Sequence, residues 1–109
     1  MKNAKLLFLF FLVFPTSAHA GHVYGTLRDS DGRPVQGAPV GIRCSGGTYS
    51  GQTDLYGSYA ILVSETGKCS LVVNCGGQNL TADIYSYAQP VKYDFDCTTV
   101  GANRQLRRR

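Results

Sequence analysis

The sequence predicts an all-β protein, a sandwich of two antiparallel sheets. After residue 20, apolar residues recur at every second position, which is the spacing of strands that bury one face. Clusters of Gly, Pro, Asp and Ser, which favour tight turns, separate these stretches about every eight to twelve residues. Gly, Ser, Thr, Tyr and Val dominate the same region, and no segment has the apolar spacing of a helix.

The stretch from Val23 to Tyr59 shows this pattern most clearly. Val23 and Leu27 share one face of a strand, which must end at the turn residues 29–32. Apolar and small or charged residues alternate again over 40–44, so the chain doubles back as a second strand. Continued along the chain, the same reasoning predicts seven strands, at residues 22–27, 38–44, 47–53, 58–63, 69–75, 80–86 and 91–97.

Residues 1–20 have the pattern of a secretory signal peptide. Two lysines precede the apolar run from Leu6 to Phe14, and Ala18 and Ala20 provide the small residues of a cleavage site. We therefore expect a secreted or periplasmic protein whose mature chain begins at residue 21. The apolar run is shorter than the roughly 20 residues that cross a bilayer, so no transmembrane segment is predicted.

The basic residues are concentrated at the C-terminus. After residue 20 there are nine basic and seven acidic residues, and four of the nine are Arg104, Arg107, Arg108 and Arg109. The remainder is weakly acidic, which argues against a specific nucleic-acid-binding face. Residues 99–109 lack alternation, so we expect a disordered, Arg-rich tail beyond a sandwich domain at 21–98. Such a tail would contact anionic surfaces weakly, and its removal would leave stability unchanged.

Four cysteines behind a predicted signal peptide indicate disulfides. If the second and fifth strands are antiparallel neighbours, Cys44 lies near Cys69. If the last three strands alternate in direction, Cys75 lies near Cys97. Of the three possible connectivities, only Cys44–Cys69 with Cys75–Cys97 meets both conditions. Each bond would close a loop of about 25 residues, worth roughly 3.5 kcal/mol of chain entropy.

Three motifs appear in order over residues 22–75: Val-Tyr-Gly-Thr-Leu-Arg-Asp-Ser-Asp-Gly-Arg-Pro-Val-Gln-Gly-Ala-Pro-Val, then Thr-Asp-Leu-Tyr-Gly-Ser-Tyr, then Gly-Lys-Cys-Ser-Leu. Together they resemble the carboxypeptidase regulatory-like domain family. That resemblance implies a seven-stranded, transthyretin-like sandwich that serves as an accessory or adhesive module and not as a catalyst. Cys44 and Cys69 are also similar to the linked cysteines of the pollen-allergen-like extracellular domains.

A second resemblance concerns the opening of the mature chain. His22-Val23 with Gly32-Arg33-Pro34 is similar to the start of the hydroxyisourate hydrolases, which share the transthyretin fold. Those enzymes end in a Tyr-Arg-Gly-Ser tetrapeptide at the active site, and residues 103–109 contain none. His22 is the only histidine after residue 20, so no catalytic residue is assigned. One imidazole is too few for a zinc site, and neither a metal nor a cofactor is expected.

Seven tyrosines stand out in so short a chain. We expect Tyr85 and Tyr87 to face solvent, with Tyr24 a candidate neighbour. Such a strip could anchor a protein partner or stack on sugar rings. Tyrosines that merely suit a half-exposed sheet would show the same pattern. The candidate binding residues are these three tyrosines and the four C-terminal arginines.

The sequence thus favours a non-catalytic, secreted or periplasmic module that binds a protein or another component of the cell envelope. A small transthyretin-fold hydrolase similar to the hydroxyisourate hydrolases is one alternative. A carbohydrate-binding module is another, and a purely structural role in the envelope has no feature that separates it from the first hypothesis.

Overall fold

The computed structural model describes residues 21–109, and these residues form nine strands in two sheets. The predicted signal peptide at residues 1–20 lies outside the described part. In chain order the strands are β1 (Gly21–Arg28), β2 (Pro39–Arg43), β3 (Thr48–Gln52), β4 (Ser58–Val63), β5 (Gly67–Cys75), β6 (Gln78–Ser86), β7 (Val91–Lys92), β8 (Phe95–Val100) and β9 (Asn103–Arg108).

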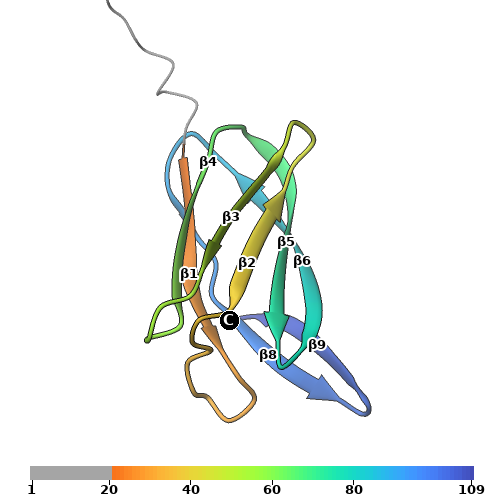
Figure 1. Ribbon diagram of the computed structural model, residues 1–109. Helices are drawn as coiled ribbons and strands as arrows, with labels where there is room; N and C mark the ends of the chain where they lie inside the picture. The colour runs from red at the N-terminus through yellow and green to blue at the C-terminus, as the bar shows by residue number, and fades with distance from the viewer. Residues whose placement is uncertain (1–20) are drawn as a thin grey trace, which may run out of the picture.

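The two sheets pack face to face as a sandwich (Figure 1). One sheet has the order β4-β1-β8-β9, with β7 also paired to β1, and the other has the order β3-β2-β5-β6. β1 runs antiparallel to β4 but parallel to β7 and β8. The β8–β9 hairpin, blue in Figure 1, extends beyond the ends of the other strands.

The core lies between the sheets and follows from the alternation seen in the sequence. In β1 the odd-numbered residues are buried while His22 and Tyr24 are exposed. Fully burying one large aliphatic side chain contributes about 1.5–3 kcal/mol, so this pattern fixes which face of each strand turns inward. The buried apolar residues include Val23, Leu27, Val40, Ile42, Ile61, Val63, Leu71, Val73, Leu80, Ile84 and Phe95.

Both predicted disulfides are confirmed. Cys44–Cys69 lies within one sheet, because β2 and β5 are antiparallel neighbours with Arg43 opposite Ser70. Cys75–Cys97 joins β5 to β8 and so connects the two sheets. The second pairing was predicted from strand direction alone, and the structure adds that the bond crosses from one sheet to the other.

The predicted number of seven strands is wrong, in part because the expected strand at 91–97 is split into β7 and β8. Tyr93 and Asp94 lie between the two. The Tyr93 N–H donates to the Tyr24 carbonyl at 2.8 Å, but the Thr26 N–H donates to the Asp94 side chain at 2.9 Å. A carboxylate thus replaces a backbone acceptor in the ladder, and regular pairing with β1 resumes only at Leu27.

The prediction of a disordered tail at 99–109 is also wrong. β8 continues to Val100, the chain turns at Gly101 with φ of +62°, and β9 pairs antiparallel with β8. This register places Leu106 opposite Cys97, where it packs half-buried against the core. The sandwich therefore extends past the predicted boundary at residue 98 and includes β9.

Candidate binding site

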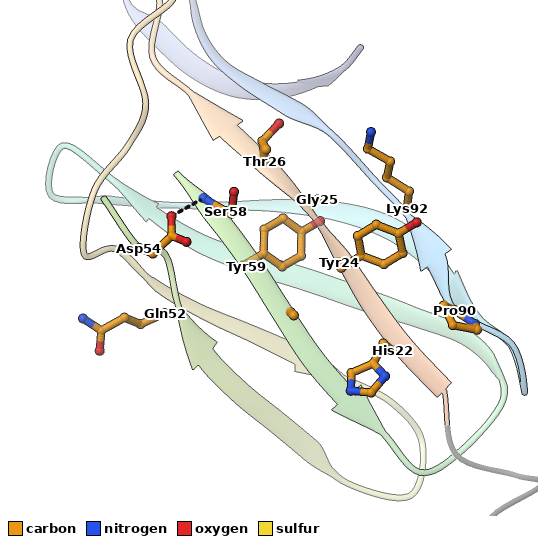
Figure 2. Close-up of a pocket in the computed structure, with 11 residues that line it drawn as sticks. His22, Tyr24, Gly25, Thr26, Gln52, Asp54, Ser58, Tyr59, Pro90 and Lys92 are labelled. Atoms are coloured by element: carbon orange, nitrogen blue, oxygen red, sulfur yellow. Dashed lines mark hydrogen bonds between the residues drawn. The ribbon is translucent and has the colours of Figure 1, made fainter. Parts of the chain in front are cut away.

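A groove of about 670 Å³ lies on the outward face of the sheet that contains β1 (Figure 2). Strand alternation turns His22, Tyr24 and Thr26 of β1 toward it. The neighbouring strand β4 adds Ser58 and Ala60, which are the register partners of Thr26 and Tyr24. The remaining lining residues are Gly25, Gln52, Asp54, Tyr59, Pro90 and Lys92.

Tyr24 forms the middle of the groove. The residue is 40% exposed, and its register partner on β4 is the small Ala60. Its partner on the other side is Lys92 of β7, and Figure 2 shows the two side chains next to each other. A flat aromatic face beside a cation, with hydroxyl groups nearby, is suited to bind a ligand with both apolar and polar surfaces.

One end of the groove is fixed by a rigid turn between β3 and β4. The Asp54 Oδ1 atom accepts hydrogen bonds from the N–H groups of Tyr56, at 2.8 Å, and Ser58, at 2.9 Å. The Gly57 N–H donates to the Asp54 carbonyl at 3.1 Å, and Gly57 has φ of +75°. The tip of this turn displays Leu55 and Tyr56, which are 70% and 78% exposed.

A network of charged side chains borders the groove next to Thr26. Asp94 Oδ1 accepts from both the N–H and the hydroxyl of Thr26, at 2.9 and 3.0 Å, and Lys92 Nζ lies 3.6 Å from Asp94 Oδ2. The Arg109 Nη2 atom donates to the Thr26 hydroxyl at 2.7 Å. Desolvation by itself raises the pKa of Asp94, but the Thr26 hydrogen bonds, Lys92 and Arg109 outweigh it and lower that pKa below its ordinary value.

The network continues to the outer face of β8. Arg109 Nε lies 2.7 Å from Asp96 Oδ1, and Arg28 Nε lies 3.4 Å from the same oxygen. Two guanidinium groups therefore share one carboxylate. Arg107 is the register partner of Asp96 and is exposed.

Asp94 gives a prediction about pH. Because its pKa is lowered in the folded state, its contribution to stability is present above the unfolded pKa of about 4 and is lost as the pH falls through the folded pKa. The Asp94→Asn variant should be less stable than the wild type at neutral pH, and the difference should shrink as the pH falls below about 4. Urea denaturation over a pH series measures this difference in the free energy of unfolding. A difference that stays constant with pH would contradict the lowered pKa of Asp94.

Buried tyrosines form a structural cluster beneath the groove. The Tyr59 hydroxyl donates to the Tyr93 carbonyl at 2.6 Å, and the Tyr93 hydroxyl accepts from the Tyr85 N–H at 2.9 Å. The guanidinium of Arg108 lies over the Tyr93 ring, 4.5 Å from its centroid. Burial, followed by the charges of Asp94 and Tyr93, raises the pKa of Tyr59 far above its ordinary value, against a smaller opposing effect of Arg108.

The structure does not bring the predicted binding residues together at one site. Tyr24 lies in the groove, but Tyr85 and Tyr87, which are 42% and 50% exposed, do not line it. Tyr85 is on the outward face of β6, in the opposite sheet, so the three tyrosines form no single strip. Sequence reasoning missed Asp54, Lys92 and the displayed turn, although two large apolar residues inside a turn motif were a visible signal.

Three of the four C-terminal arginines interact with the rest of the fold. Arg104 donates from Nη1 to the Cys75 carbonyl at 2.9 Å, Arg108 stacks on Tyr93, and Arg109 bonds Asp96.

Within residues 21–109, no three His, Cys, Asp or Glu side chains gather as a metal site. The same described part contains no helix long and apolar enough to span a membrane.

No protein-family model matches the chain, and no curated protein matches it. Among solved structures, the 5-hydroxyisourate hydrolase of Klebsiella pneumoniae is similar, with a TM-score of 0.60 and 15% identity over 82% of this chain and 98% of that one. The dioxygenase domain of a dioxygenase carbohydrate-binding protein fusion from Streptomyces sp. SirexAA-E has a TM-score of 0.54 and 13% identity, over 87% and 80%.

The 3-chlorocatechol 1,2-dioxygenase of Rhodococcus opacus 1CP has a TM-score of 0.51 and 9% identity, and the match covers 83% of this chain but only 57% of that one. At such identities the likeness shows the fold alone. The protein is an all-β sandwich with two disulfides and a transthyretin-like fold. The resemblance to the carboxypeptidase regulatory-like family stays a prediction.

Proposed function

We propose that the protein is a non-catalytic, secreted or periplasmic module that binds a protein or another component of the cell envelope. The observation that carries the proposal is the open groove around Tyr24, whose ring is exposed between a small residue and a cation. Such a concave surface, with an aromatic residue and a few polar groups, is typical of binding sites. The rigid turn that displays Leu55 and Tyr56 next to the groove adds apolar contact area.

The compartment is supported by the two disulfides, which persist in oxidising environments. Each closes a loop, of 25 and 22 residues in sequence separation, and contributes roughly 3.5 kcal/mol on the chain-entropy model. A small sandwich that works outside the cytoplasm gains rigidity from such bonds. The groove would then be presented by a scaffold that changes little on binding.

We expect residues 21–109 to sediment with a washed cell-envelope fraction from the producing organism, and Tyr24→Ala to lower that retention about tenfold. The reason is the loss of the exposed ring at the centre of the groove. Tyr87→Ala is the matched control, because this tyrosine is also exposed but does not line the groove. Equal retention of both variants and the wild type would contradict the proposed surface.

A hydrolase related to the hydroxyisourate hydrolases is the second candidate. It is favoured by the position of His22, which lines the groove together with the hydroxyl groups of Thr26 and Ser58. His22 lies four residues along β1 from Thr26, roughly 13 Å, so as a general base it would act on a bound water and not through either hydroxyl. A ureide hydrolysis assay separates the two candidates, since turnover that disappears in His22→Ala would replace the binding proposal with this one.

A further inference from the structure

The shape of the groove favours an extended ligand. From His22 to Thr26 it follows β1 over four residues, a distance of roughly 13 Å at the rise of a strand. Pro90 and Lys92 border it on the β7 side, and Gln52 and Asp54 lie toward the β3–β4 turn (Figure 2). A linear chain lying along β1 would use this length, whereas a compact molecule would use only part of it.

The chemistry of the lining matches a sugar chain. The ring of Tyr24 is flat and exposed, and small Ala60 next to it leaves room above the sheet. Further along the groove lie the hydroxyls of Thr26 and Ser58, and the amide of Gln52 lies at its β3 side. The apolar face of a sugar can stack on an aromatic ring while its hydroxyls bond such groups. The two register partners of Tyr24, the small Ala60 and the cationic Lys92, suit a ligand whose hydroxyls and charge surround a stacked ring.

The charge beside the groove indicates an acidic chain. The three cations Lys92, Arg109 and Arg28 interact with only two carboxylates, Asp94 and Asp96, which leaves an excess of one positive charge. Arg107, which lies opposite Asp96 across the ladder and therefore on the same face, adds another. Lys92 lines the groove itself, and Arg109 bonds Thr26, which also lines it.

The acidic group of the groove lies away from these cations. Asp54 belongs to the turn between β3 and β4, where its Oδ1 atom is already bound by two backbone N–H groups. At the Lys92 side the nearest carboxylate is Asp94, whose Oδ2 atom lies 3.6 Å from Lys92 Nζ and whose Oδ1 atom is bound by Thr26. An anionic ligand group there would therefore be attracted by the excess of cations over carboxylates on this side, and it would not face Asp54 directly.

We propose that this groove binds a linear acidic glycan, with a sugar ring on Tyr24 and its carboxylate directed toward Lys92 and Arg109. The inference rests on the proposed function and specifies the envelope component. The new element is the ligand class, a carboxylated polysaccharide. Because stacking and ion pairing use different residues, they can be tested separately.

Calorimetric titration with linear tetragalacturonate tests the inference, and the methyl ester of the same oligomer is the uncharged control. We expect the acid to bind at least about tenfold more tightly than the ester, and the binding to weaken as salt rises from about 0.01 to 0.15 M. Tyr24→Ala should weaken binding of the acid about tenfold. Lys92→Ala should weaken binding of the acid several-fold and remove part of its advantage over the ester.

Lys68→Ala is the matched control for charge, because this lysine pairs with Asp83 on the opposite sheet and should not affect binding. Unchanged melting temperatures of the variants exclude unfolding as the cause. Equal affinity for acid and ester, no dependence on Tyr24, or no binding of the oligomer would each overturn the inference. So would binding to phosphatidylglycerol vesicles that replaces binding to the oligomer.

The experiments distinguish a failure of the acidic-glycan inference from a failure of the proposed envelope-binding function. If Tyr24→Ala lowers retention on the envelope fraction but tetragalacturonate does not bind, the groove binds another component, and only the acidic-glycan inference is wrong. If neither the envelope fraction nor the oligomer is bound, the proposed function falls as well.

Discussion

Replacing Gly25 with alanine is expected to destabilise the protein by about 3 kcal/mol. A Cβ atom at this position would overlap the carbonyl oxygen of Tyr93. Because the obstacle is backbone and not a side chain, no change of rotamer can relieve it. The segment at Tyr93, which follows β7, would have to move away from β1 and lose the hydrogen bond from the Tyr93 N–H to the Tyr24 carbonyl, 2.8 Å long. Urea denaturation measures the loss.

Gly41→Ala is the matched control. A Cβ at Gly41 would have the Tyr49 carbonyl as its nearest neighbour, at 3.9 Å, which is an ordinary contact. This variant should unfold at nearly the urea concentration of the wild type. If Gly25→Ala does the same, the close approach of β1 and Tyr93 is not required. The result also bears on the groove, because β7 carries Lys92 into it.

The sheets and disulfides could be predicted because they depend on local patterns. Alternation in β1 and β4 is strict, since each strand has one face in the core and one in solvent. Each cysteine lies at an end of a predicted strand, and the direction of β2 and β5 brings Cys44 and Cys69 together once those strands are neighbours. The direction of each strand, together with the position of each cysteine on the inward face of its strand, was enough to predict both disulfides.

The groove could not be predicted, because it depends on which strands are neighbours. Tyr24 is exposed at the centre of a site only because Ala60 and Lys92 are its partners across β4 and β7. No local pattern in β1 specifies those partners. The same limit explains the incorrect grouping of Tyr24 with Tyr85, since parity gives the outward face of a strand but not the sheet to which it belongs.

The C-terminal segment was misjudged for a related reason. A short segment with one apolar residue and several arginines has the composition of a disordered tail. Amino-acid composition does not show which contacts these residues make with distant parts of the chain. Leu106 reaches the core, Arg104 bonds the end of β5, and Arg109 bonds both Thr26 and Asp96.

Deletion of residues 104–109 is therefore expected to lower the stability of the protein by about 2–3 kcal/mol, or its melting temperature by on the order of 10–20 °C. The deletion removes the packing of Leu106, the hydrogen bond from Arg104 to the Cys75 carbonyl and the Arg109 bonds, and it leaves β8 as an unpaired edge. Arg107→Ala is the control, because its side chain is exposed and its loss should shift the melting temperature little. Thermal unfolding followed by circular dichroism measures both. A truncated chain that melts with the full-length protein would mean that β9 adds nothing to the sandwich, whereas the expected loss makes the arginine-rich end a strand that the fold requires.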